Sequence, residues 1–170
     1  IKPENVLVGS NGKVLVCDWG LARILPEFKT VENYALSSIS GIYSKGSPGY
    51  MAPEQIIQKE KNIATDIYQL GGLLYSILFY RSPVEGQDVD EILAKTVAGQ
   101  LDLPAQEDDN DLIVLIRKAL AIKPSLRFQA VDEMMEAYAE ISATFIALEK
   151  RQEIILQRKI TRYRHEAGHY

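Results

Sequence analysis

Hydrophobic positions divide the chain into a strand-forming start and a loop-rich segment that follows it. Residues 5–8 and 13–17 are runs rich in Val and Leu, and Asn11-Gly12 lies between them. Asn-Gly favours the tight turn of a β-hairpin, so the two runs predict a pair of antiparallel strands. Residues 21–51 show no apolar periodicity and collect Ser and Gly, which predicts a long loop.

The remainder of the chain is predicted to be helical. The first long helix begins at Thr65-Asp66 and carries an apolar run to Tyr80, a pattern typical of a buried helix. Three amphipathic helices follow, each entered through acidic or capping residues, over residues 88–98, 111–122 and 131–148. Strands followed by helices predict an α+β fold that is mainly α-helical with a short β-hairpin.

Composition narrows the class of protein. The chain has 170 residues, of which 46% are hydrophobic and 25% charged, as expected for one folded domain. A net charge of −4 disfavours a dedicated nucleic-acid-binding protein, and a single cysteine, Cys17, excludes an internal disulfide. The longest apolar stretch, residues 70–80, is too short to span a bilayer, so we expect no membrane segment. Because the first residue is Ile1, we expect a piece of a longer chain.

Charge is unevenly distributed along the sequence. Residues 149–170 hold six Lys or Arg against three Glu, a local net of +3, so the remaining residues, with 13 basic and 20 acidic side chains, carry −7. Ile154, Ile155 and Ile160 recur among these charges, which predicts a long solvated helix. A membrane-surface or nucleic-acid role and an oligomerising or linker helix are the alternatives for this segment.

Two side chains with oxygen donors lie at the ends of the predicted hairpin. Asn5 opens the hairpin and Asp18 follows it, so the fold brings them close together. Such donors suit Mg²⁺ bound to phosphate, and Lys2 could reach a phosphate oxygen. Gly20 allows the backbone to turn after Asp18. The alternative is that Asn5 and Asp18 are ordinary turn and strand-end residues.

Five segments together carry a more specific signal than any single residue. They are Ile1-Lys2-Pro3-Glu4-Asn5, Asp18-Trp19-Gly20, residues 46–54 ending in Ala52-Pro53-Glu54, residues 65–71, and residues 123–128. In this order they resemble the catalytic loop, the Asp-Phe-Gly motif, the Ala-Pro-Glu motif, the long buried helix and the late Arg-containing segment of eukaryotic-type (Hanks-type) serine/threonine protein kinases. The resemblance implies a kinase C-terminal lobe over residues 1–140 without the N-terminal lobe, followed by a basic helical extension over 141–170.

The resemblance also implies ATP and Mg²⁺ as cofactors and a protein as substrate. Asp18 and Asn5 would hold Mg²⁺, and Lys2 would stabilise charge on the transferred γ-phosphoryl group. The residues implied to bind ATP are Lys2, Asn5, Leu7 and Asp18, with Leu73 and Ile77 beneath Leu7. Lys2 in this loop resembles the serine/threonine version of the family, so Ser or Thr is the expected acceptor.

Further residues receive structural or substrate roles from the same resemblance. Glu54 and Arg127 would form a buried ion pair, and Asp66 would hold the catalytic-loop backbone. Residues implied for the substrate-binding loop are Ser47, Gly49 and Tyr50, and Ser47 could also bond Lys2. Candidate phosphorylation sites in the preceding loop are Thr30, Ser37, Ser38, Ser40, Tyr43 and Ser44.

The sequence departs from the family pattern in two ways. Trp19 replaces the usual Phe, a change that we interpret as tolerated. The catalytic Asp would immediately precede Ile1, and the N-terminal lobe is missing, so we expect this chain alone to be inactive and its parent protein to be a cytoplasmic kinase. We expect exposed apolar surface around Leu7 and Trp19. The alternative function is a pseudokinase-type binding or scaffold module.

One further pattern lies at the end of the chain. His165-Glu166-Ala167-Gly168-His169 fits the H-E-x-x-H spacing of zinc hydrolases. No third ligand follows, and Gly168 weakens a helix there. We therefore interpret the match as coincidence within a basic tail.

Overall fold

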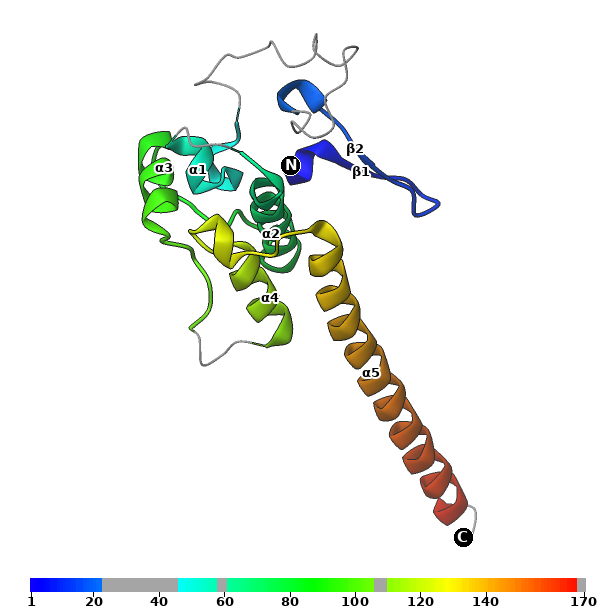
Figure 1. Ribbon diagram of the computed structural model, residues 1–170. Helices are drawn as coiled ribbons and strands as arrows, with labels where there is room; N and C mark the ends of the chain where they lie inside the picture. Colours follow the sequence, from blue (N-terminus) through cyan, green and yellow to red (C-terminus); the bar gives the residue numbers. More distant parts are fainter. Residues whose placement is uncertain (23–45, 58–60, 106–109, 168–170) are drawn as a thin grey trace. The chain divides into compact units, whose positions relative to one another are not determined.

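The computed structural model describes residues 1–22, 46–57, 61–105 and 110–167 (Figure 1). The chain divides into two compact units, residues 1–134 and residues 135–170. Helices account for most of the described residues, and a two-stranded antiparallel sheet accounts for the rest of the regular structure. This agrees with the predicted mainly helical chain with a short hairpin.

The hairpin consists of β1 (Val6–Val8) and β2 (Val14–Val16), with Val6 opposite Val16 and Val8 opposite Val14. Gly12 has a φ of 76°, a left-handed conformation that glycine adopts without steric cost, as the turn requires. Both strands are shorter than predicted. Asn5 instead ends a 3₁₀ turn, Pro3–Asn5, because Pro3 has the fixed φ that starts such a turn.

Helix α2 spans Ile63–Phe79 and starts two residues before the predicted Thr65. The earlier start follows from Asn62, whose side chain accepts a hydrogen bond from the Ala64 N–H and so caps the helix. The helix ends where Tyr80 turns into the left-handed region at φ 56°. A short helix, α1 (Pro53–Ile56), precedes it.

Two amphipathic helices follow, and each starts at the predicted residue or one residue after it. Helix α3 spans Val89–Ala98, is capped by Asp88 and ends at Gly99, which has a φ of 70°. Helix α4 spans Asp111–Ala119 and is capped by Asn110. It ends three residues before the predicted position, and the carbonyls of Ala121 and Ile122 accept hydrogen bonds from Arg127 instead of continuing the helix. A separate 3₁₀ turn, Pro124–Leu126, follows.

The core of the first unit lies around α2 and α4. Its buried side chains include Tyr68, Tyr75, Ile116 and Leu120, each at most 1% exposed. Helix α2 is not buried on every side, however, because Ile77 is 61% exposed. The prediction of a buried helix therefore holds for the face towards α4 and is wrong for the face that carries Ile77.

Helix α5 runs without interruption from Val131 to Ala167. It continues past the predicted end at residue 148, because no proline or glycine occurs before Gly168. The charged tail is thus helical, as its pattern indicates. Across the part of the chain that the structure describes, no helix has the length and apolar character needed to cross a membrane.

The close approach of α2 and α4 depends on Gly71. A Cβ atom at this position would lie 2.7 Å from the Ala119 Cβ, whereas at Gly72 the nearest atom would be the Tyr50 Cδ1 at 3.3 Å. Because the helical backbone near Ala119 cannot yield as a side chain can, we predict that Gly71→Ala lowers the free energy of unfolding by about 1–3 kcal/mol. The measurement is urea unfolding followed by circular dichroism. Gly72→Ala is the matched control and should lose less, since alanine also favours the helix; equal losses would contradict the packing argument.

Candidate functional site

Lys2 and Ser47 meet although they lie far apart in the sequence. The Lys2 Nζ donates a hydrogen bond to the Ser47 Oγ over 2.8 Å. The Lys2 carbonyl accepts the Asn5 N–H at 3.0 Å, which closes the 3₁₀ turn before the hairpin. Ser47 in turn precedes another 3₁₀ turn, Pro48–Tyr50. The structure therefore connects the first turn of the chain to the segment that leads into α1.

Asn5 and Asp18 occupy neighbouring positions at the open end of the hairpin. The Cys17 N–H donates to the Asn5 carbonyl over 2.8 Å, so pairing continues one step beyond Val6 and Val16, and Asp18 comes next. Asn5 is half-buried and Asp18 is exposed. Asp18 has a φ of 59° and ψ of 69°, a left-handed conformation that is uncommon for residues other than glycine. Such local strain is frequent at functional sites.

Trp19 and Gly20 follow in a 3₁₀ turn, Trp19–Leu21. The Trp19 Nε1–H donates to the Val16 carbonyl over 2.9 Å, while the side chain as a whole is 70% exposed. A Cβ atom on Gly20 would lie 3.3 Å from the Asp18 Oδ1, so glycine here leaves the carboxylate unobstructed. The turn thus presents the acid of Asp18 and the indole of Trp19 at the surface.

Leu7 is 53% exposed, and the hairpin residues from Val8 to Val16 are exposed as well, whereas Val6 is half-buried. This agrees with the expected apolar surface around Leu7 and Trp19. The resemblance also implies that Ile77 packs beneath Leu7, but Ile77 is itself 61% exposed. Leu7 and Ile77 are therefore not buried together by the described residues, because no described element covers this face of the hairpin.

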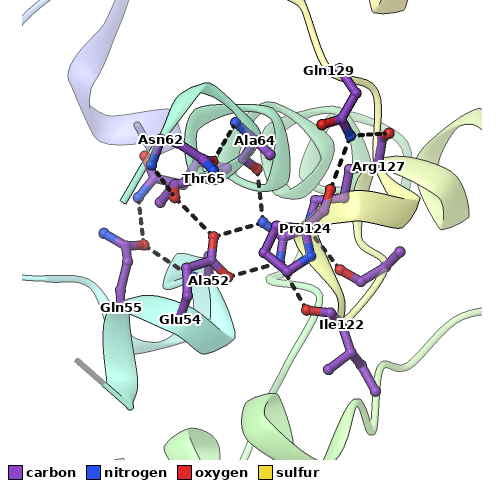
Figure 2. A network of polar contacts seen from close by, with 12 residues as sticks. Ala52, Glu54, Gln55, Asn62, Ala64, Thr65, Ile122, Pro124, Arg127 and Gln129 are labelled. Atoms are coloured by element: carbon purple, nitrogen blue, oxygen red, sulfur yellow. Dashed lines mark hydrogen bonds and ion pairs between the residues drawn. The ribbon is translucent and has the colours of Figure 1, made fainter. Parts of the chain in front are cut away.

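Glu54 and Arg127 form a buried, bidentate ion pair (Figure 2). The Arg127 Nη1 and Nη2 donate to the two carboxylate oxygens of Glu54 over 2.7 and 2.8 Å. Glu54 is 3% exposed and Arg127 is 2% exposed. The Thr65 hydroxyl donates to the Glu54 Oε1 over 2.8 Å, so α1, α2 and the segment after α4 meet at one carboxylate.

The remaining donors of Arg127 are also satisfied. Its guanidinium donates to the carbonyls of Ala64, Ala121 and Ile122 over 2.7 to 3.1 Å. Together with the two bonds to Glu54, these account for all five N–H groups of an arginine. The same guanidinium lies 4.8 Å from the centre of the Tyr68 ring, within the range of a cation–π contact. Full pairing of this kind compensates for the cost of burying a charge.

Burial alone would raise the pKa of the Glu54 carboxyl. The hydrogen bonds from Arg127 and Thr65 outweigh that effect and leave the pKa below its ordinary value. Glu54 is therefore ionised at neutral pH despite its buried position. Burial also raises the pKa of the neighbouring Tyr68, which stays protonated.

A second chain of polar contacts joins the first residue to α1. The Ile1 amino group donates to the Gln69 Oε1 over 2.6 Å, and the Gln69 Nε2 donates to the Gln55 Oε1 over 2.9 Å. The Gln55 Oε1 also accepts the Ala52 N–H over 2.8 Å, a contact visible in Figure 2. Sequence reasoning missed Gln55 and Gln69, because nothing in the pattern distinguishes them from surface glutamines.

Asp66 lies on the exposed side of α2 near this first residue. Burial lowers the pKa of the Ile1 amino group, and the negative charge of Asp66 opposes the effect. Within the described part of the chain, no hydrogen bond joins the Asp66 carboxylate to residues 1–5. Its implied role in holding the loop backbone thus rests on the resemblance.

The predicted substrate-loop residues lie on the 3₁₀ turn before α1. The Tyr50 hydroxyl lies 3.0 Å from the Ser76 Oγ on α2. A Cβ atom on Gly49 would lie 2.7 Å from the Ser82 Oγ and 3.1 Å from the Val84 carbonyl, so the turn packs too closely there for a larger residue. The candidate phosphorylation sites between Thr30 and Ser44 lie outside the described residues.

The protein kinase domain model matches residues 1–139 of the chain. The chain belongs to the protein kinase domain family. Among curated proteins it is similar to serine/threonine-protein kinase PknD of Protochlamydia amoebophila, at 30% identity over 151 residues, and to PknD of Chlamydia muridarum, at 31% over 153. A probable serine/threonine-protein kinase of Streptomyces coelicolor, SCO3848, is 30% identical over 137 residues.

These matches cover 79%, 81% and 79% of this chain, respectively. They cover only 15%, 16% and 20% of the three relatives, so the chain spans a fifth or less of the length of each. The matched family region ends within α5, whereas the helix continues to Ala167.

The candidate metal ligands of this kinase domain are the side-chain oxygens of Asn5 and Asp18. No group of three or more His, Cys, Asp and Glu side chains lies close enough to hold a metal within the residues that the structure describes. Nucleotide-bound Mg²⁺ needs only one or two protein oxygen ligands, because phosphates and waters supply the others. The side chains of Asn5 and Asp18 carry oxygen ligands of this chemical type.

The last two residues of the His165–His169 motif lie outside the described part of the chain.

Removal of one partner from the buried pair of Glu54 and Arg127 should destabilise the kinase domain strongly. We predict that Arg127→Met lowers the free energy of unfolding by about 3–5 kcal/mol, because it leaves the Glu54 charge buried without a partner. Urea unfolding, followed by the circular dichroism signal of the helices, measures this loss of unfolding free energy. Lys95→Met is the control, since it breaks the exposed ion pair with Glu91 and should cost far less. Similar losses for both variants would contradict the analysis.

The lowered pKa of Glu54 sets the pH range over which ionised Glu54 ceases to stabilise the fold. A carboxyl whose pKa is lower in the folded state stabilises the fold above its unfolded pKa, about 4.3, and loses that stabilisation as the pH falls through the folded value. We predict that the free energy of unfolding declines below about pH 4.3 and that Glu54→Gln flattens the decline. Unfolding measured in urea at a series of pH values tests this. An unchanged slope in the variant would refute the assignment.

Proposed function

We propose that residues 1–140 form the C-terminal lobe of a serine/threonine protein kinase and that residues 141–170 are a helical extension. The contact between Lys2 and Ser47 carries the proposal, because it joins the end of the catalytic loop to the substrate-binding loop. The order of the five motifs and the family match support the assignment. The similarity to proteins named as serine/threonine kinases and Lys2 itself favour Ser or Thr as the acceptor.

The cofactors that we propose are ATP and Mg²⁺, held at the open end of the hairpin. Asp18 and Asn5 would supply the protein oxygens to the ion, which when bound neutralises phosphate charge and orients the phosphates. The ammonium group of Lys2 would face the transferred phosphoryl group, where it stabilises the negative charge that develops. The Ser47 hydroxyl fixes the Lys2 side chain in position. The exposed Leu7 offers an apolar surface for the adenine.

The substrate in this proposal is a Ser- or Thr-containing protein segment. It would bind along Ser47–Tyr50, where the close packing of Gly49 against Ser82 and Val84 fixes the backbone. The bond between Tyr50 and Ser76 anchors the same turn to α2. Because Lys2 reaches Ser47 directly, the substrate hydroxyl would lie beside the phosphate-binding residues. ATP is the phosphoryl donor, so we expect the kinase to act in the cytoplasm.

Phosphoryl transfer also needs a base and an N-terminal lobe, which we propose lie upstream in the parent protein. We predict that the 170-residue chain alone transfers no labelled phosphate from ATP to a Ser/Thr-rich protein. The longer protein should do so with Mg²⁺ present. Asp18→Ala in that protein should reduce kcat by at least about 100-fold, because it removes a metal ligand. Scintillation counting of the acceptor measures the transfer.

Asp88→Ala is the matched control for this experiment. Asp88 is an exposed acid that caps α3, so its replacement should leave kcat within about threefold. A parent protein that binds ATP and an acceptor but transfers no phosphate would favour the pseudokinase-type scaffold. Undiminished transfer by the Asp18→Ala variant would refute the role of Asp18.

A further inference from the structure

Helix α5 carries an apolar stripe with the spacing of a coiled coil. From residue 138 onward, its members alternate at intervals of three and four residues, and they are Tyr138, Ile141, Phe145, Leu148, Gln152 and Ile155. In a heptad these are successive a and d positions, which lie along one side of the helix. Gln152 is the only polar member.

The stripe is open to solvent. Tyr138, Phe145, Leu148 and Ile155 are between 46% and 53% exposed, and Met135 and Leu156, which flank it, are 63% and 57% exposed. Met134, by contrast, is 8% exposed and belongs to the core of the first unit. The stripe that is available to a partner therefore begins at Tyr138.

Charge is separated along the same helix. Residues 131–149 contain five acidic and no basic side chains, whereas residues 150–167 contain six basic and two acidic ones. Acids near the start and bases near the end also stabilise an isolated helix through its dipole. The dipole does not account for a heptad stripe of large apolar residues, however. A partner that covers the stripe must carry the opposite charge gradient.

We propose that residues 138–156 pair with the same segment of a second copy of this chain, in antiparallel orientation. An antiparallel copy brings the acidic start of one helix to the basic end of the other. A parallel copy would instead place acids beside acids and bases beside bases, which is unfavourable. The charge gradient thus favours the antiparallel over the parallel orientation for a second copy.

The heptad positions fix the register of the pair. With Phe145 opposite the partner's Leu148, Tyr138 lies opposite the partner's Ile155 and Ile141 opposite the partner's Gln152. Every layer then joins an a position to a d position, and Met135 flanks the partner's Leu156. A shift of one heptad towards the start would place Gln152 opposite the buried Met134, and a shift towards the end would place Ile141 opposite the partner's Lys159. The proposed register is therefore the one in which every layer pairs two members of the accessible stripe.

Sedimentation equilibrium of the full 170-residue chain tests the association. We expect a monomer–dimer equilibrium, and Phe145→Glu should raise the dimer dissociation constant by at least about 100-fold, because it buries a charge at the central layer. The matched control is Ala143→Glu, which adds the same charge on the opposite side of the helix and should change the constant less than about threefold. Circular dichroism checks that both variants keep their helix content.

Disulfide trapping tests the direction. In a Cys17→Ser background, a Tyr138→Cys chain mixed with an Ile155→Cys chain should form the mixed disulfide in preference to either symmetric one. Predominant symmetric disulfides would indicate a parallel pair and overturn the proposal. A chain that stays monomeric at about 100 µM would also overturn it. So would a monomer that pellets with phosphatidylserine vesicles, which would identify α5 as a lipid-binding helix.

This proposal is independent of the proposed catalytic function. The Asp18→Ala variant should dimerise like the unmodified chain, because Asp18 lies outside α5. Loss of phosphoryl transfer with dimerisation intact would separate the two conclusions. Loss of dimerisation in Asp18→Ala would contradict the assignment of the interface to α5 alone.

Discussion

The buried pair of Glu54 and Arg127 is the interaction on which the rest of the kinase domain depends. Two opposite charges removed from water are stable only when their hydrogen-bonding capacity is met. The five N–H groups of Arg127 meet acceptors from α1, α2 and the segment after α4. A displacement of any of these three segments would leave a buried donor or acceptor without a partner. Their relative arrangement is therefore tightly specified.

The proposed functional residues are positioned from this centre outward. Glu54 fixes α1, and the turn immediately before α1 carries Ser47, which holds Lys2. A second route runs through Gln55 and Gln69 to Ile1. The first turn of the chain is thus attached to the core at two points. Among the described residues no comparable attachment holds the hairpin that follows, because its side chains from Leu7 to Val16 are exposed.

Local signals in the sequence were sufficient for most elements. Asn11-Gly12 predicted the hairpin, and capping residues predicted the starts of α3 and α4 to within one residue. The ion pair between Glu54 and Arg127 spans 73 residues, so no local pattern could reveal it, and only the motif resemblance did. The Gln55–Gln69 bond and the close approach at Gly71 arise from tertiary packing and could not be predicted. The exposure of Ile77 was missed because an apolar run does not state which of its faces is covered.

The contrast between core and hairpin bears on how an ATP site could form here. A two-stranded hairpin is only marginally stable unless another element covers its apolar face. Leu7 and Trp19 are exposed, whereas Glu54 and Arg127 are fully enclosed. Among the described elements, stability is therefore concentrated around Glu54 and Arg127, and the proposed metal ligands Asn5 and Asp18 border the exposed hairpin. An element that covers Leu7 and Trp19 would order the hairpin and fix the relative positions of Asn5 and Asp18. Covering the hairpin and completing the proposed metal site would then be one physical event, because both depend on the same two short strands.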